Sequence, residues 1–133
     1  MKIRLAELET RFYGLAGLKD KHLPAKVQYA ITRNKKRLGE EIETMMIQRT
    51  DILEKRALRG KDEKPIINDE TKQYEYGSAE DKEQTLRDCQ ELFDAQIDMD
   101  LMMVEMEQLE RCDTEAFDTL TGNDMDALEF MIR

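Results

Sequence analysis

One stretch of sequence, residues 24–59, decides the predicted fold and reads PAKVQYAITRNKKRLGEEIETMMIQRTDILEKRALR. Pro24 suits the first position of a helix, where its missing N–H is no loss, and Gly60 suits the residue just after a helix. We therefore expect one uninterrupted helix from Pro24 to Arg59, about 54 Å long. Apolar residues recur along it at near-heptad spacing and form a packing stripe of Val27, Ile31, Leu38, Ile42, Met45 and Ile52.

A second, shorter helix is predicted just before the long one, over residues 4–18. Its apolar residues recur every three or four positions and are Leu5, Leu8, Phe12, Leu15 and Leu18. The two segments predict an antiparallel helical hairpin over residues 1–60. A chain of 133 residues has little material left to cover a helix of this length. The long stripe therefore predicts self-association or the docking of a protein partner.

The middle of the chain changes its period. Residues 65–67 and 73–76 are rich in β-formers and flank the turn-forming residues 68–72, which predicts a β-hairpin within residues 61–77. Ser78 then resembles a helix N-cap, because an acidic residue, Asp81, follows three positions later. The helix that it opens should extend over residues 79–95 and bury Leu86, Cys89, Leu92 and Phe93.

Residues 97–104 allow two interpretations. They alternate apolar and acidic side chains before becoming wholly apolar, which favours a third strand joined to the hairpin. Helical spacing of Phe93, Ile97, Leu101 and Val104 leaves a continuation of the helix open. Short helices are expected around residues 105–111 and after Thr121. The whole chain then forms a single α+β domain, dominated by its helices, in which a helical hairpin supports a small antiparallel β-sheet and short C-terminal helices.

Composition and charge narrow the classes of function. No segment approaches the ~20 consecutive apolar residues of a membrane-spanning helix, and the charged N-terminus does not resemble a secretory signal. We therefore expect no membrane association and a cytosolic protein whose two cysteines, Cys89 and Cys112, are reduced thiols.

The formal net charge of −9 is unevenly distributed along the chain. Residues 88–133 carry fourteen acids and two bases, whereas residues 1–87 carry sixteen acids and nineteen bases. The simplest interpretation is a solvated face, with some attraction between the acidic C-terminal region and the basic residues 33–37 of the long helix. A sharper hypothesis is an acidic surface that meets a basic partner and speeds association by electrostatic steering. Its candidate residues are Asp94, Asp98, Asp100, Glu105, Glu107 and Glu110.

Direct nucleic-acid binding is not expected. We identify no aromatic residue near the basic residues 33–37 that could stack on a base. The net negative charge of the chain also repels phosphate. Binding to another protein, or to further copies of the chain, remains the expected kind of partnership.

No pattern of catalytic residues is visible. The chain has one serine, Ser78, which is explained as a helix cap, and one histidine, His22, in a predicted loop. Asp94, Asp98 and Glu105 match oxygen-ligand positions of a calcium loop, but Met99 stands where that loop needs glycine. We therefore expect no enzyme activity, no bound metal and no cofactor.

The order of short motifs nevertheless resembles a known group of proteins. The chain passes from KHLPAK at residues 21–26 through YAITRN at 29–34 and GKDE at 60–63 to the acidic IDMD at 97–100, and it closes with ALEFMI at 127–132. This series is similar to a family of small uncharacterised proteins encoded by tailed phages and prophages of Gram-positive bacteria. The resemblance implies a viral origin, a β-strand at residues 98–104 and no catalytic residues to transfer.

Taken with the resemblance, these features predict a non-catalytic phage accessory protein that acts through protein–protein interaction. One version is a virion or tail-associated component, or an assembly factor, found in the host cytoplasm or the virion. The alternative is an acidic inhibitor of a host defence nuclease that imitates DNA, as anti-CRISPR proteins do. A small hydrolase or metal-binding protein is the least supported alternative.

Overall fold

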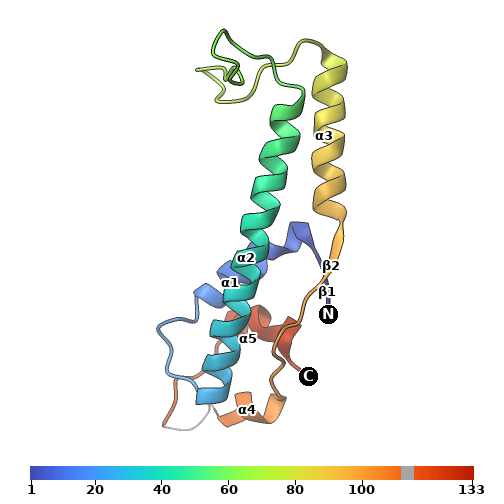
Figure 1. Ribbon diagram of the computed structural model, residues 1–133. Helices are drawn as coiled ribbons and strands as arrows, with labels where there is room; N and C mark the ends of the chain where they lie inside the picture. The colour runs from blue at the N-terminus through green and yellow to red at the C-terminus, as the bar shows by residue number, and fades with distance from the viewer. Residues whose placement is uncertain (112–115) are drawn as a thin grey trace. The chain divides into compact units, whose positions relative to one another are not determined.

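The computed structural model describes residues 1–111 and 116–133 and is dominated by helices (Figure 1). Its elements, in chain order, are β1 (Lys2–Arg4), the 3-10 turn η1 (Leu5–Glu7), α1 (Leu8–Ala16), α2 (Ala25–Lys55), α3 (Ala79–Asp94), β2 (Gln96–Asp98), α4 (Met106–Glu110), α5 (Gly122–Leu128) and the 3-10 turn η3 (Glu129–Met131). One long helix, a small antiparallel sheet and short C-terminal helices confirm the predicted fold class.

The long helix α2 is uninterrupted over 31 residues, which confirms the central prediction. It begins one residue after Pro24, whose carbonyl accepts the N–H of Gln28 at 3.0 Å and closes the first turn. It ends four residues earlier than predicted, because the N–H of Ala57 bonds back to the carbonyl of Glu54 at 3.2 Å. Gly60 is therefore not the residue after the helix, and its φ is not positive.

The chain divides into two compact units. The terminal unit comprises residues 1–42 and 96–133, and the hairpin unit comprises residues 43–95. The helix α2 contributes residues to both. The expectation that the whole chain is a single domain stays a prediction.

The sheet lies in the terminal unit and joins the two ends of the sequence. β1 and β2 pair antiparallel, with Ile3 opposite Ile97. The prediction of a strand over residues 97–104 that joins the 61–77 hairpin is wrong in its length and partner, and the helical alternative is also not observed. The reason is Asn34 on α2, whose side-chain amide bonds both the N–H and the carbonyl of Met102, at 2.7 and 2.8 Å. These two bonds hold residues 99–104 in an extended path along the helix rather than in a sheet.

The first predicted helix, residues 4–18, is shorter in the structure. Arg4 is extended, with φ −76° and ψ 143°, and Ile3 is buried in the small sheet, so the helical conformation starts only at η1. The helix α1, which follows η1, packs closely on α5. A Cβ placed on Gly14 would lie 3.2 Å from the Cβ of Ala127, so glycine permits this approach. The core of the terminal unit includes the fully buried Leu8, Leu15, Leu23, Leu38, Leu128 and Met131.

In the hairpin unit, residues 57–76 fold back without a regular strand. Isolated antiparallel bridges join Ala57 to Tyr76, Arg59 to Pro65 and Ile67 to Tyr74. The predicted 61–77 hairpin thus turns back through single bridges, because Pro65 lacks an N–H with which to extend a ladder. Two tyrosines attach the segment to α2. The hydroxyl of Tyr74 donates to Glu54 at 2.9 Å, and that of Tyr76 donates to the carbonyl of Leu53 at 2.8 Å.

The helix α3 begins where the cap motif predicts. The N–H of Asp81 donates to the Ser78 hydroxyl at 3.1 Å, which confirms Ser78 as the N-cap. Its predicted buried face is only partly correct. Cys89 is buried, and Leu92 and Phe93 are half-buried, but Leu86 is 57% exposed. Thr85 takes its place in the interior and satisfies its hydroxyl by donating to the carbonyl of Asp81 at 2.8 Å.

Candidate protein-binding groove

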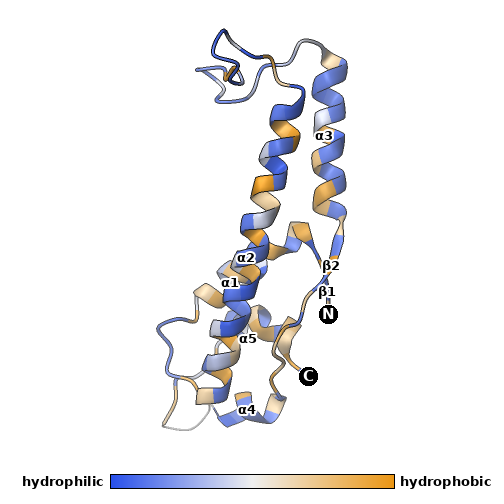
Figure 2. Ribbon diagram, viewed as in Figure 1, coloured by the Kyte–Doolittle hydropathy of each residue, from blue (hydrophilic) through white to orange (hydrophobic). Residues whose placement is uncertain are grey.

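The predicted apolar stripe of α2 is covered unequally along its length. Val27, Ile31 and Leu38 are buried within the terminal unit, and Ile42 is half-buried at its end. Beyond residue 42 the stripe continues into the hairpin unit, where Met45 is buried and Ile52 is half-buried. Hydropathy colouring shows further apolar residues on this part of α2 and on α3 (Figure 2). The candidate surface is therefore on the hairpin unit.

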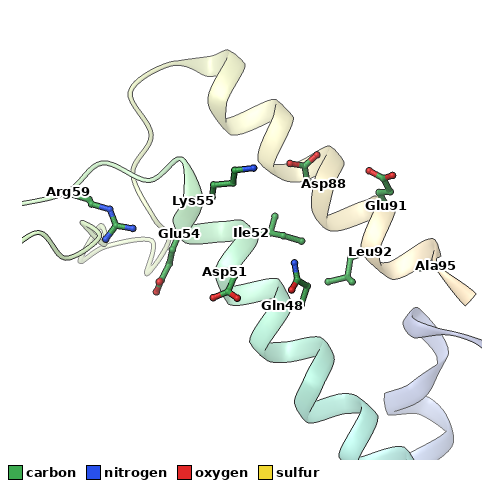
Figure 3. A pocket seen from close by; sticks show the side chains of 10 residues that line it. All are labelled: Gln48, Asp51, Ile52, Glu54, Lys55, Arg59, Asp88, Glu91, Leu92 and Ala95. Atoms are coloured by element: carbon green, nitrogen blue, oxygen red, sulfur yellow. The ribbon is translucent and has the colours of Figure 1, made fainter. Parts of the chain in front are cut away.

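An open groove of about 700 Å³ lies between the second half of α2 and α3, entirely within the hairpin unit (Figure 3). Ile52 and Leu92 point toward each other across it and form its apolar centre with Ala95. The polar residues Gln48, Asp51, Glu54, Lys55, Arg59, Asp88 and Glu91 surround this centre. An apolar strip with a charged border is typical of protein-binding surfaces rather than of enclosed small-molecule sites.

One ion pair beside the groove joins α3 to Arg56, the residue that directly follows α2. A guanidinium nitrogen of Arg56 lies 2.8 Å from Asp88, whose other oxygen accepts the Gln84 amide at 2.9 Å. The Gln84 hydrogen bond and the Arg56 hydrogen bond hold the pKa of Asp88 below its usual value. Asp88 therefore stays ionised and keeps the contact at neutral pH. The sequence did not predict this pair, because Arg56 and Asp88 are 32 positions apart and no local pattern links them.

The interior of the hairpin unit is small and includes a thiol. Cys89 is free and only 7% exposed, and burial raises the pKa of its thiol. It is therefore an unreactive, neutral side chain at pH 7. The expectation of a reduced Cys112 lies outside the described residues.

The six candidates of the predicted acidic surface are divided between the two units. Asp94 belongs to the hairpin unit and accepts the Gln90 amide at 3.0 Å, whereas the other five candidates belong to the terminal unit. Three of those five lie near a cation of the same unit. Asp98 lies 2.9 Å from the N-terminal amine, Asp100 lies 3.4 Å from Arg33, and Glu105 lies 3.5 Å from Arg133. The remaining two candidates, on α4, are the exposed Glu107 and Glu110.

The N-terminal amine also controls the ionisation of Asp98. Its hydrogen bond to the carboxylate, together with its charge, holds the pKa of Asp98 below the usual value. The predicted attraction between the acidic region and the basic part of α2 is likewise present, because Asp100 lies 3.4 Å from Arg33 and 3.9 Å from Arg37. Much of this acidic charge therefore serves internal contacts.

The basic cluster of α2 has an aromatic neighbour that the sequence interpretation overlooked. Tyr29 is 63% exposed and lines one shallow depression with Arg33, Lys36 and Arg37. The statement that no aromatic residue lies nearby is wrong, since Tyr29 precedes Arg33 by one helical turn. Two of these cations also face Asp100, which reduces the attraction that they offer to phosphate.

The serine and the histidine considered for catalysis belong to different units. Ser78 caps α3 in the hairpin unit, whereas His22 lies in a loop of the terminal unit and stacks on Phe117 at 5.3 Å. Within residues 1–111 and 116–133, no three His, Cys, Asp or Glu side chains are grouped so that they could hold a metal ion. No helix in the same ranges has both the length and the apolar character needed to cross a membrane.

Comparisons with known proteins give no relative. No protein-family model, no curated protein and no solved structure matches this chain. The geometry of the two units is therefore the basis for a functional proposal.

Proposed function

We propose that this chain is a non-catalytic accessory protein that acts by binding another protein through its hairpin unit. The observation that supports this proposal is the incomplete core of that unit. Among the described residues, only Met45, Ala57 and Cys89 are buried apolar side chains within residues 43–95. Large apolar side chains remain exposed over the same range, namely Met46, Ile47, Leu58, Ile67 and Leu86. Exposed large apolar side chains gathered in one part of a protein are a mark of interaction sites.

Site-specific photo-cross-linking tests the proposal. A photoreactive amino acid replaces Ile47 or Leu86 in the hairpin unit, or Met106 in the terminal unit as the control, since all three side chains are exposed. We expect both hairpin positions to trap another chain in the cells that naturally make the protein, and Met106 to trap none. Absence of cross-links from both hairpin positions would reject the proposal.

The resemblance to small proteins of tailed phages and prophages suggests where this binding takes place. We propose a role in the virion, its tail or its assembly, which predicts that the chain is present in purified particles or in assembly intermediates. Immunodetection in purified virions tests this part.

The alternative, an acidic inhibitor of a host nuclease, has less support. The six candidate acids are divided between the two units, and Asp98, Asp100 and Glu105 face cations of their own chain. This alternative predicts salt-sensitive binding to a nuclease and early expression.

A further inference from the structure

A second cavity of the hairpin unit differs from the groove in the sign of its charges. It has a volume of about 370 Å³ and is lined only by residues of that unit. Its charged lining residues are Arg49, Lys72 and Lys82, and no Asp or Glu side chain among the described residues lines it. The groove, by contrast, is lined by both signs of charge. This basic cavity therefore favours an anionic occupant.

The three cations of the basic cavity are not neutralised within the described chain. Their side chains are all exposed, and none of them takes part in an ion pair of residues 1–111 and 116–133. Glu54, which accepts the hydroxyl of Tyr74 at 2.9 Å, lines the groove rather than this cavity. The basic cluster of α2 is different in this respect, since its Arg33 already faces Asp100. The basic cavity is therefore the better site for an added anion.

The remaining walls of the basic cavity are partly aromatic and apolar. Tyr74 and Tyr76 line it while their hydroxyls donate to α2, and Leu86, which is 57% exposed, lines it from α3. On α2 the exposed Met46 precedes the lining residue Thr50 by one helical turn, so apolar surface continues beyond the cavity. A large apolar side chain that covers these walls would remove them from water.

We propose that the basic cavity binds an acidic segment of the partner protein. One large apolar side chain of that segment packs on Tyr76 and Leu86, and neighbouring carboxylates pair with the three cations. This inference rests on the proposed function and gives the chemistry of the partner. The volume is near the lower end of the range for small-molecule sites, about 300–1,000 Å³, and suits one inserted side chain. The apolar surface at Met46 favours a longer peptide over a compact nucleotide, which would use the cavity alone.

Binding of short synthetic peptides to the full chain tests the proposal. The probe is the acetylated and amidated peptide Asp-Glu-Phe-Glu-Asp. One matched peptide has serine in place of phenylalanine, and the other has asparagine and glutamine in place of the acids. Amide chemical shifts followed by NMR during titration give each Kd and locate the site.

We expect the probe to bind with a Kd on the order of 1 mM or below, because the contact is small and exposed. The shifts should be concentrated in residues 49–53, 72–76 and 82–86, which line the basic cavity. Each matched peptide should bind about fivefold more weakly or worse, since one lacks the apolar anchor and the other lacks the charges.

Variants at exposed positions test the same contacts from the side of the chain. Arg49→Gln with Lys82→Gln should weaken binding of the probe about fivefold or more, because two of its cations are lost. The matched control is Lys61→Gln with Lys64→Gln, which removes two exposed lysines of the same unit outside the basic cavity and should stay within about twofold. Leu86→Ser should weaken binding of the probe but not of the serine peptide. Circular dichroism verifies that the variants fold.

Three results would overturn the inference. They are no amide shift at about 10 mM probe, equal weakening by the two pairs of substitutions, and tighter binding of adenosine monophosphate than of the probe. If one of them occurs while position 47 or 86 still traps a protein in cells, the proposed function stands and the acidic segment is excluded. Absence of cross-links from both positions removes the proposed function and this inference with it.

Discussion

The two units of this chain differ in how much apolar surface they bury, although they share one helix. Of the twenty buried apolar side chains in the described residues, seventeen belong to the terminal unit and three to the hairpin unit. Apolar burial is the main favourable term in folding, at about 25 cal/mol per Å². The terminal unit thus has a well-buried apolar core, whereas the hairpin unit buries few apolar side chains completely. The difference teaches that one unbroken helix can pack into a well-buried core along one part and leave large apolar side chains exposed along another.

Truncating apolar side chains on α2 should give the largest difference in unfolding free energy between the two units. Leu38→Ala, at a fully buried position of the terminal unit, should lower the free energy of unfolding by about 2–5 kcal/mol. Ile47→Ala, in the hairpin unit and 61% exposed, should change it by less than about 0.5 kcal/mol. Urea denaturation at a concentration where the chain is monomeric measures both. Equal losses would show that the two parts of α2 are buried alike.

The next test concerns the polar contact that gives the terminal unit its unusual extended segment. Asn34 is fully buried and holds both backbone groups of Met102. Asn34→Ala leaves those groups without their partner and should cost about 1–3 kcal/mol of unfolding free energy. Thr32→Ala, at an exposed position of the same helix, is the control. Hydrogen exchange should also speed up at the Met102 amide, and unchanged protection there would contradict the assigned role.

These residues explain why the sequence predicted some features and not others. The α2 helix, the Ser78 cap and the fold class followed from local patterns, because spacing and caps depend on neighbours in sequence. The pairing of β1 with β2 and the Asn34–Met102 bonds join residues 68 or more positions apart, and no local pattern encodes them. Leu86 was misjudged because its position in the helical period predicted burial, whereas the hairpin unit leaves 57% of it exposed.

The same limit applies to the candidate site. The sequence correctly marked α2 as one long amphipathic helix, but four of the six predicted stripe residues are buried within the chain and Ile42 and Ile52 are half-buried. The groove needs Leu92 and Glu91 of α3 beside Ile52 of α2, which only tertiary structure brings together. The predicted acidic surface stays a prediction. Residues near in sequence, such as Asp94 and Asp98, belong to different units.

Local opening gives a finer measure of the difference, with Cys89 as the probe. In a Cys112→Ser background, Cys89 should react with a thiol reagent through opening of the hairpin unit rather than through global unfolding. The matched control replaces both native cysteines by serine and adds Ala30→Cys, a buried position of the terminal unit. Under native conditions we expect Cys89 to react about tenfold faster or more, because its unit has fewer buried contacts. Equal rates with equal urea dependence would mean that the two units open together.

The smallest expected effect is a pH-dependent loss of stability when one aspartate of either unit is replaced. Asp88 in the hairpin unit and Asp98 in the terminal unit both have a pKa below the usual Asp value in the folded chain. Such a group stabilises the fold above its unfolded pKa of about 4, and this contribution is lost as the pH falls through the lower, folded pKa. Asp88→Asn should therefore lower stability at pH 7 and make no difference near pH 3. Hydrogen exchange should report that loss within residues 43–95, whereas the loss from Asp98→Asn should appear around β1 and β2. A loss from Asp88→Asn that spreads evenly over both units would mean that the Arg56–Asp88 contact stabilises the whole chain rather than the hairpin alone.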